Sequence, residues 1–564
     1  MFTPGQSVQI STPPVLAPSD DQPAAPAPAA SARFASVWES LRRWESSAAL
    51  LLISTVYSLI QGATQNIIGI DGYYHVKVAL LMREQGWRLL APLDFPWLQL
   101  TILGPGRYTD HHFLFHVLQT PFTFGDLRIG AKMAAVLFAV VGLYTTYLFL
   151  ARLGVRYPFL WIAALLACAP IFLWRQSMAR TQSLSLLLIV LGLWALFAGR
   201  PRLLLPIGFA AAWLFNGFFF VIGAPLAAVL VSLTHLAARR WWLRDCESEG
   251  PRLSFAVSAL AWTLFGLGLG LLLHPYFPRN VEFAFFHLLP KAVPADQGTV
   301  TVGQEWYPYS FNGFLVRVGP SATLTALGLV PIFHQLARRR WPDWRSLVLG
   351  ILALGFLTMV ARSQRLIEYY PAFAVIFCAW SWSHAPATIA ALAGLARFSL
   401  SERMYQILGR LRPVVPWLIA VALVPSIVTS TLIASREADD GADWNTYRDG
   451  ALWLARNTPA GSRVFTTGWD DFPQMFFWNT HNTYLVGLDP TYTSLDDPER
   501  YQLWRSITQG RVMAPSKLIL EQFGASYILS DLRHERFLQM ADADPGLERV
   551  LRTRTVAIYR VRGG

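Results

Sequence analysis

The segment that decides the fold class runs from Ala131 to Ala151 and reads AKMAAVLFAVVGLYTTYLFLA. The short basic stretch RLGVR, residues 152–156, follows it directly. A helix needs about 20 mostly apolar residues to cross the hydrocarbon core of a bilayer. Lys and Arg are enriched in the cytoplasmic connectors of membrane proteins. The segment therefore predicts a transmembrane helix that ends at the cytoplasmic side.

Similar apolar segments recur along the chain. Of the 564 residues, 54% are hydrophobic and 15% are charged, whereas soluble domains carry roughly a quarter charged residues. We predict a polytopic membrane protein with about eleven to thirteen spans. The candidate segments are 47–66, 131–151, 157–174, 184–199, 203–218, 220–237, 254–274, 319–337, 345–361, 366–382 and 413–434.

The connectors between these segments fall into two alternating sets. One set is short and basic, as in Arg200–Arg202 and Arg338–Arg345. The other set is longer or richer in acids, His and aromatic residues, and comprises 67–130, 175–183, 275–318 and everything after 434. The excess of Lys and Arg places the first set in the cytoplasm and the second set outside.

The two ends of the chain differ from its middle. Residues 1–45 begin with a stretch rich in Pro, Ala and Ser that lacks the apolar core of a signal peptide, and we predict a disordered cytoplasmic tail. Residues 46–434 form the predicted membrane domain. Residues 435–564 are more polar and alternate helix-like with strand-like stretches, which predicts a small extracytoplasmic α/β domain of about 130 residues.

The net charge of +12 does not indicate a nucleic-acid-binding protein. The Arg and Lys residues fall in short clusters between apolar segments, without the basic stripe and interleaved aromatic residues of a nucleic-acid surface. The three cysteines also give no disulfide framework or metal site, because Cys168 and Cys378 lie inside apolar segments and Cys246 in a basic connector.

The first external connector contains two groups of candidate site residues. Asp71 opens the motif DGYYH, where an acid facing water can ligate a divalent cation; the alternative is a carboxylate that marks the interface. Asp110, His111 and His112 are candidate metal ligands. An ordinary polar loop is the alternative for them, because adjacent side chains point apart on most backbones.

Later external segments contain candidate phosphate-binding and acceptor-binding residues. Arg175, Arg180 and Arg365 lie at predicted helix ends, where a guanidinium can bind phosphate oxygens. The alternatives are snorkelling for the first two and an i,i+3 pair with Glu368 for Arg365. Glu305, in the stretch TVTVGQEW, is a candidate for holding an acceptor amide or a metal, with a solvated strand-edge Glu as the alternative.

The polar C-terminal region contributes the turn TGWDDFP, residues 467–473. An Asp beside a Trp, here Asp470 beside Trp469, can accept a hydroxyl hydrogen bond against an apolar wall. Taken alone, this pattern predicts only a turn.

Taken in this order, the motifs resemble those of the catalytic subunit of oligosaccharyltransferases, especially the single-subunit archaeal and bacterial enzymes of the GT-C class of membrane glycosyltransferases. The resemblance covers most of residues 45–500 and implies a mainly α, GT-C-type membrane domain followed by a small α/β domain. It implies that Asp71 binds a divalent metal and the acceptor, that Glu305 binds the acceptor, and that Arg365 meets the lipid pyrophosphate. It also implies that Trp469 and Asp470 contact the Ser or Thr of a glycosylation sequon.

The sequence departs from the family pattern at two places. Gln182 stands where the second acidic motif should provide a metal ligand, so that Asp110, His111 or His112 would have to replace it. The WWDYG element of the family is reduced to GWDDF at 468–472, which puts an Asn-x-Ser/Thr sequon in doubt.

The resemblance implies an inverting glycosyltransferase in the plasma (inner) membrane of a prokaryote. It would move a glycan from a polyprenyl (pyro)phosphate-linked donor to an acceptor, foremost a protein, on the outer face, with Mn or Mg as cofactor. One alternative is a monosaccharide transferase that uses a polyprenyl monophosphate sugar and a lipid or glycan acceptor. Another is a non-catalytic homologue that binds a polyprenyl lipid or acts as a scaffold.

Overall fold

The computed structural model describes residues 29–241, 250–292, 303–399, 414–441 and 443–563. The chain divides into two compact units, Met1–Ala48 and Ala49–Gly564, and helix α1 (Ala29–Gly62) belongs to both. Residues 1–28 of the predicted tail lie outside the described residues, but residues 29–45 are helical. The reason is local, because the sequence contains no Pro or Gly between Ala29 and Gly62, and these residues oppose helix most strongly.

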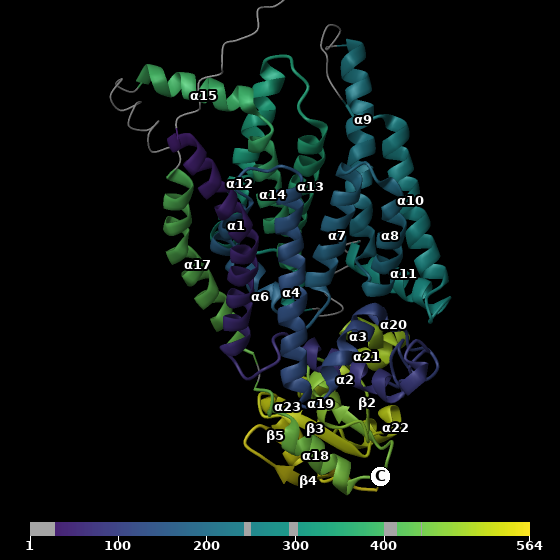
Figure 1. The fold of residues 1–564 in the computed structure, drawn as a ribbon. Coiled ribbons are helices and arrows are strands. Elements are labelled where there is room, and N and C mark those ends of the chain that lie inside the picture. Colours follow the sequence, from purple (N-terminus) through teal and green to yellow (C-terminus); the bar gives the residue numbers. More distant parts are fainter. Residues whose placement is uncertain (1–28, 242–249, 293–302, 400–413, 442, 564) are drawn as a thin grey trace, which may run out of the picture. The chain divides into compact units, whose positions relative to one another are not determined.

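The second unit before its sheet domain is built mainly from helices, with a long irregular connector between η1 and α3 (Figure 1). Their bounds after α1 are α2 (Asp71–Glu84), η1 (Gly86–Arg88), α3 (Phe113–Gln119), η2 (Thr120–Thr123), α4 (Leu127–Arg152), α5 (Pro158–Cys168), α6 (Pro170–Gln176), α7 (Gln182–Phe197), η3 (Pro201–Leu203), α8 (Leu204–Leu214), η4 (Phe218–Ile222), α9 (Gly223–Trp241), α10 (Leu253–Leu272), α11 (Arg279–Ala292), η5 (Gln304–Trp306), α12 (Phe311–Ala337), α13 (Trp344–Arg362), η6 (Gln364–Glu368), α14 (Tyr370–Ser383), α15 (Pro386–Ser399) and α17 (Val415–Asp439).

Within the described residues, six helices are long and apolar enough to cross a membrane, or up to eight spans if each of two bent helix pairs counts as one. The six are Leu127–Arg152, Phe218–Arg240, Leu253–Leu272, Phe311–Ala337, Trp344–Arg362 and Val415–Asp439. The protein is therefore an integral membrane protein with several spans, as predicted. The predicted number of about eleven to thirteen spans is too high by this criterion of length and composition.

The excess has a physical cause in proline positions and helix lengths. Helices α5 and α6 meet at 95°, and α14 and α15 at 72°. In each pair the second helix begins with a proline, Pro170 or Pro386, which cannot continue the hydrogen-bond ladder of the preceding helix. Helices α7 and α8 are apolar but only 16 and 11 residues long, and an apolar window alone does not reveal where a helix stops.

Capping side chains determine where long helices begin. Asp126 Oδ1 accepts hydrogen bonds from the backbone N–H groups of Arg128 and Ile129 at 2.8 and 3.0 Å and caps α4. Asp343 Oδ2 caps α13 by accepting from the N–H of Ser346 at 3.1 Å. Such caps contribute about 1 kcal/mol each. They place the far end of α13, Arg362, just before the turn η6 that carries Arg365.

Helices α8 and α10 pack closely because glycines line their contact. A Cβ built on Gly266 would lie 2.2 Å from the carbonyl oxygen of Leu205, and one built on Gly208 would lie 2.8 Å from that of Thr263. Small residues let membrane helices approach backbone to backbone, where van der Waals contact replaces the hydrophobic driving force of water. The two helices also run alongside each other in Figure 1.

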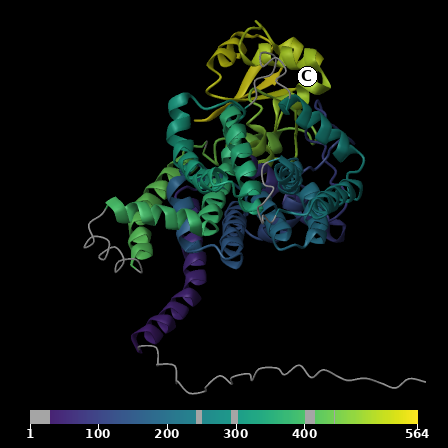
Figure 2. The same ribbon diagram turned by 90° about the horizontal axis from the view of Figure 1, so that it is seen from above.

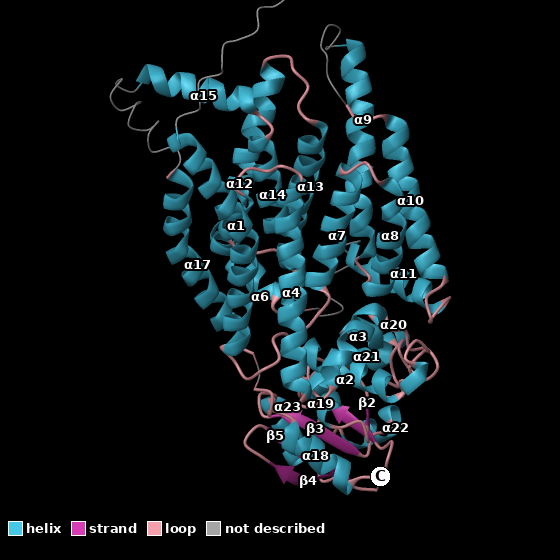
Figure 3. Ribbon diagram, in the orientation of Figure 1, coloured by secondary structure: helices cyan, strands magenta, loops and turns pink. Residues whose placement is uncertain are grey.

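The C-terminal part is a mixed α/β domain, as predicted. Its five-stranded sheet has the order β2-β1-β3-β5-β4, with β1 parallel to β2 and β3, and β5 antiparallel to β3 and β4. The strands lie together, apart from the long helices, in both views (Figures 2 and 3). The elements are α18 (Arg448–Asn457), β1 (Arg463–Thr466), α19 (Phe472–Trp478), β2 (Thr483–Tyr484), α20 (Pro490–Asp496), α21 (Pro498–Thr508), α22 (Ser516–Phe523), β3 (Tyr527–Asp531), α23 (Glu535–Ala543), β4 (Leu547–Arg552) and β5 (Val556–Val561).

The first external connector packs against this C-terminal domain. Leu98 forms an isolated bridge with Tyr484 of the edge strand β2, and the indole N–H of Trp97 donates to the carbonyl oxygen of Thr480 at 2.8 Å. Tyr74 of α2 and Phe476 of α19 belong to one buried aromatic cluster. Helix α2, which begins at Asp71, is therefore held between the membrane part and the sheet domain.

The glycine contact between α8 and α10 predicts a specific sensitivity to one methyl group. Gly266→Ala should lower the unfolding free energy by about 1–3 kcal/mol, because the added Cβ meets backbone that can move only with the whole helix. Gly268→Ala is the matched control, since a Cβ there meets nothing within 4 Å. Thermal unfolding of the two purified variants in detergent measures the difference, and equal melting temperatures would contradict the packing described.

Candidate active site

Three arginines from separate segments meet at one edge of the membrane part. Arg175 lies in the last turn of α6, Arg180 precedes α7, and Arg365 lies in the turn η6. The turn between α6 and α7 is fastened to neighbouring segments, because the amide of Gln61 donates to the carbonyl oxygen of Ser177 at 2.5 Å and the N–H of Ala179 donates to that of Ile68 at 3.2 Å. This turn therefore places two arginines beside the start of α2.

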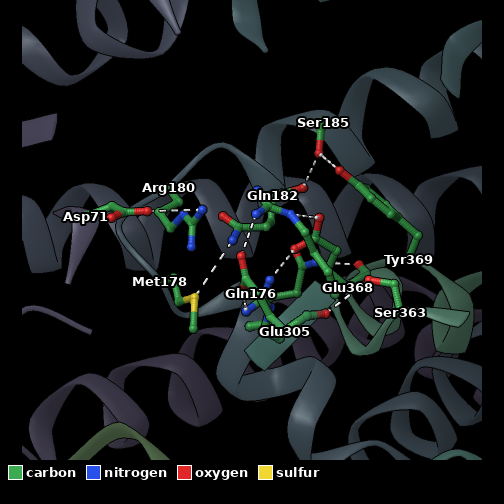
Figure 4. Close-up of polar contacts among 12 residues, drawn as sticks. Asp71, Gln176, Met178, Arg180, Gln182, Ser185, Glu305, Ser363, Glu368 and Tyr369 are labelled. Atoms are coloured by element: carbon green, nitrogen blue, oxygen red, sulfur yellow. Dashed lines mark hydrogen bonds and ion pairs between the residues drawn. The ribbon is translucent and has the colours of Figure 1, made fainter. Parts of the chain in front are cut away.

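Two of the arginines form a network with two glutamates. Arg175 Nη1 lies 2.6 Å from Glu305 Oε2, and Arg175 Nη2 lies 3.1 Å from Glu368 Oε2. Arg365 Nη1 lies 2.5 Å from Glu305 Oε1, whereas its Nε is 4.0 Å from Glu368 Oε1. The two glutamates of this network, Glu305 and Glu368, lie near each other in Figure 4. The structure thus brings together the predicted residues Arg175, Glu305 and Arg365, and adds Glu368.

The charges of this network determine the protonation state of Glu305. Burial alone would raise the pKa of the Glu305 carboxyl, but the guanidinium groups of Arg365 and Arg175 hold the pKa well below its usual range. Glu305 is therefore an anion at neutral pH. Its carboxylate pairs with the guanidinium groups of Arg175 and Arg365 at the same time.

Asp71 and Arg180 form a second ion pair beside this network. Arg180 Nη2 lies 3.1 Å from Asp71 Oδ2, and both residues appear together in Figure 4. Asp71 is the first residue of α2, where a carboxylate is also favoured by the helix dipole. The predicted catalytic acid thus lies next to one of the predicted phosphate-binding arginines.

A cavity of about 400 Å³ lies against both ion-paired groups. Its wall combines charged side chains with aromatic rings and amides, a lining that can hold a polar ligand with flat apolar faces. The charged and aromatic members include Arg175, Arg180, Glu305, Tyr73, Trp174 and Tyr309, and the amides are Asn66, Gln304, Gln364 and Gln474.

Asp110 belongs to a separate buried chain of histidines. Its Oδ2 lies 2.6 Å from His116 Nδ1, and His116 Nε2 lies 2.8 Å from His75 Nδ1. Burial alone would raise the pKa of the Asp110 carboxyl, but His116 brings that pKa below its usual value, and burial lowers the pKa of His75. Sequence reasoning assigned no role to His75, although it stands four positions after Asp71 and can share a helix face with it. It considered His116 only as a neighbour of the Asp110, His111 and His112 group, one helical turn onward.

His111 and His112, the other predicted metal ligands, lie beside this chain of histidines. The ring centroid of His112 is 5.0 Å from that of His75 and 3.9 Å from that of His111. The described part of the chain contains no group of three or more His, Cys, Asp or Glu side chains that could hold a metal ion. The Asp71 carboxylate faces Arg180, and Asp110 faces His116. The donor set around Asp71 therefore does not fit a divalent cation, and none of the steps below is assigned to one.

Gln182, which stands in place of the second acid, is buried beside the same turn. Its Nε2 contacts Met178 Sδ at 3.7 Å, and its Oε1 has no hydrogen-bond partner among the described residues. A neutral amide at this position supplies neither a charge for a metal nor a second base.

Trp469 and Asp470 lie in the turn between β1 and α19, both half-buried. Trp469 lies close to the segment of Glu305, because a Cβ built on Gly303 would be 4.0 Å from its ring. Thr301, in the same external loop, lies outside the described residues. The neighbouring Asp471, to which sequence analysis gave no role, is the fully buried acid of this turn. It accepts hydrogen bonds from the hydroxyl of Tyr447 and, at 3.1 Å, from the N–H of Gly468.

No protein-family model matches the sequence, and no curated protein matches it. Solved structures do match the fold. The oligosaccharyltransferase of Archaeoglobus fulgidus in its apo form is similar with a TM-score of 0.61 and 15% identity, over 90% of this chain and 72% of that one. The same archaeal enzyme, in complex with an inhibitory peptide and a dolichol-phosphate, gives 0.57 and 14%, over 89% and 71%. ArnT from Cupriavidus metallidurans bound to undecaprenyl phosphate gives 0.51 and 17%, over 93% and 98%.

These likenesses show that the chain has the fold of GT-C membrane glycosyltransferases. The fold class inferred from the motifs is confirmed at this level. Membership of the oligosaccharyltransferases in particular stays a prediction.

Asp471 predicts how the stability of the protein depends on pH. Burial raises the pKa of its carboxyl to about 7, against roughly 3.9 in an unfolded chain. Between these values the folded state binds more protons than the unfolded state, so the unfolding free energy falls as the pH rises. The contribution of Asp471 to the melting temperature should therefore decline from pH 4.5 to 6.5, and Asp471→Asn should remove this decline. Buried His75, whose pKa is lowered, contributes with the opposite sign in this window, so the measured quantity is the difference in melting temperature between the variant and the parent protein at each pH.

The exposed Asp440 provides the control, because Asp440→Asn should leave the decline unchanged. Asp531, whose pKa is about 2, contributes with the opposite sign only below this pH window. Identical slopes in Asp471→Asn and the parent protein would show that Asp471 does not carry the proton.

Proposed function

We propose that the chain is an inverting membrane glycosyltransferase whose donor is a sugar linked to a polyprenyl phosphate. The observation that carries the proposal is the gathering of Arg175, Arg180 and Arg365 with Asp71 in neighbouring ion pairs beside one cavity, which Arg175 and Arg180 line. Guanidinium groups match phosphate oxygens in charge and geometry. The dolichol-phosphate and undecaprenyl phosphate bound to proteins of similar fold support a lipid phosphate as the ligand class.

In the proposed reaction the acceptor oxygen attacks the anomeric carbon from the face opposite the phosphate. The bond between the anomeric carbon and the phosphate oxygen breaks, and its electron pair leaves with the phosphate. The arginines stabilise the negative charge that develops there. Asp71 takes the proton of the acceptor as general base, since it lies outside the Arg175–Glu305–Arg365–Glu368 network and pairs with Arg180, which lines the cavity.

The geometry best supports a hydroxyl of a glycan or lipid as the acceptor, with transfer of a single sugar. An amide nitrogen shares its lone pair with the carbonyl group, so it requires stronger activation than a hydroxyl does. The proposed reaction uses one carboxylate for this purpose, Asp71, while the neutral Gln182 occupies the position of a second acid. One general base is sufficient to activate a hydroxyl.

A protein acceptor, with transfer of a whole oligosaccharide, is the second candidate. The position of Trp469 beside Gly303 and close to Glu305 favours it, because this turn corresponds to the sequon-reading element of the resemblance. The inhibitory peptide bound to the archaeal protein of similar fold supports the same reading.

A transfer assay tests the proposal directly. The purified chain is incubated with a polyprenyl monophosphate hexose or a polyprenyl pyrophosphate oligosaccharide, a glycolipid and Asn-containing peptides, with EDTA or with added Mn²⁺ or Mg²⁺. Mass spectrometry should find one hexose added to the glycolipid. An oligosaccharide on a peptide would establish the second candidate, and bound lipid without any transfer would favour a non-catalytic polyprenyl-binding protein.

Removal of the proposed general base should stop turnover without stopping donor binding. Asp71→Asn should lower kcat by about 10²- to 10⁴-fold, because the amide cannot accept the proton of the acceptor. The affinity for the donor should change little, since the arginines remain. Asp449→Asn removes an exposed carboxylate that does not line the cavity and serves as the control. Full activity of Asp71→Asn would rule out this role.

A further inference from the structure

Glu305 bridges the two arginines as a phosphate would. Its two carboxylate oxygens contact different guanidinium groups, Oε1 that of Arg365 at 2.5 Å and Oε2 that of Arg175 at 2.6 Å. The two arginines come from α6 and η6, almost two hundred positions apart in the sequence. A phosphate presents oxygens to paired guanidinium groups in the same bridging manner.

In the described part of the site, each arginine has an anionic partner, so no positive charge is spare for an incoming anion. Arg175, Arg180 and Arg365 face Glu305, Glu368 and Asp71. Arg317, which also lines the cavity, lies 4.0 Å from Glu437. A phosphate brought into this group would add negative charge to a region removed from water, where unpaired charge is costly. A carboxylate must therefore release its guanidinium partner when a phosphate binds between Arg175 and Arg365.

Glu305 is the carboxylate best placed to move. Its side chain is 26% exposed, whereas that of Glu368 is 5% exposed. Glu368 is also fixed through its backbone, whose carbonyl oxygen accepts from the amide of Gln176 at 2.7 Å. Glu305 lines the cavity, so its carboxylate can rotate into open space.

The backbone that carries Glu305 can stay in place during this rotation. The hydroxyl of Ser363 donates to the carbonyl oxygen of Glu305 at 3.0 Å, and the N–H of Gln364 donates to that of Tyr307 at 3.1 Å. These bonds attach the turn η5 to the segment that leads into η6. Only side-chain torsions of Glu305 need to change.

Arg175 has a donor that the carboxylate does not use. Its Nε is buried and has no hydrogen-bond partner among the described residues, although the residue is only 4% exposed. A planar carboxylate offers two oxygens, and both are already engaged. A tetrahedral phosphate has further oxygens, one of which can accept from this N–H.

We propose that Glu305 is a placeholder anion in the donor-phosphate site, displaced from Arg175 and Arg365 by the phosphate of the polyprenyl donor. This inference rests on the proposed function. The released carboxylate turns into the cavity of about 400 Å³, where it becomes a negatively charged wall for the acceptor. Donor binding therefore precedes and prepares acceptor binding.

Binding of undecaprenyl phosphate to the full-length protein in detergent tests the inference. Glu305→Gln should bind this lipid about tenfold more tightly than the parent protein, because the neutral amide competes less well for the two guanidinium groups. Glu305→Ala should change the affinity in the same direction. Glu282→Gln, which removes an exposed carboxylate at the start of α11, should bind like the parent. Undecaprenol, which lacks the phosphate, should bind all four proteins equally.

The outcomes separate the two proposals. Affinity for undecaprenyl phosphate that is unchanged or weaker in both Glu305 variants, with a parent protein that binds it, would overturn the placeholder role and leave the proposed function intact. Equal binding of undecaprenyl phosphate and undecaprenol by every protein would overturn both, because the arginines would then recognise no phosphate. Thermal unfolding confirms that each variant is folded before it is compared.

Discussion

Burial of charge inside the protein is the constraint on which the rest of this site depends. Arg175 and Glu368 are almost completely buried, and each would be very costly without its partner. Their pairing joins the end of α6 to the turn before α14, and Glu305 joins η5 to both. The segments α6, η5 and η6 are distant in the sequence, and in this arrangement their two arginines and two glutamates all have a partner of opposite charge.

The same constraint explains why irregular backbone lies at this point. The sharp bend between α5 and α6 and the turn η6 before α14 bring Arg175 and Arg365 to one place, which two straight membrane helices in their positions would not do. Non-helical backbone at membrane depth is tolerated where protein surrounds it. On the other side, the aromatic cluster between α2 and α19 holds Asp71 against this group. The catalytic proposal therefore depends on both parts of the second unit.

Sequence reasoning predicted the parts of this arrangement but not their connections. Continuous apolar windows predicted each of the six helices that are long enough to cross a membrane. The windows identify such helices because a membrane helix makes its backbone hydrogen bonds within one segment. The bend at Pro170 could not be distinguished from a tolerated proline. Arg365 and Glu368 were considered as an i,i+3 pair, yet their contact is 4.0 Å long and each has a closer partner from another segment. Asp110 was grouped with its neighbours in sequence, whereas its partner is His116, six positions away. Spacing along the sequence cannot show which residues pair with one another, because tertiary packing determines the partners.

The pairing of each arginine with a carboxylate also has a consequence for how a donor is accommodated. In a site with surplus cations, a phosphate binds by adding contacts. Here every guanidinium group already has an anionic partner, so binding must exchange one anion for another. Exchange of this kind costs little net electrostatic energy, because the number of compensated charges stays the same. It also keeps the arginines ordered in the absence of the lipid, so that less conformational entropy is lost when the lipid arrives. A placeholder carboxylate at Glu305 therefore keeps the empty site stable. When a phosphate takes its place, the released carboxylate adds a negative charge to the adjoining cavity.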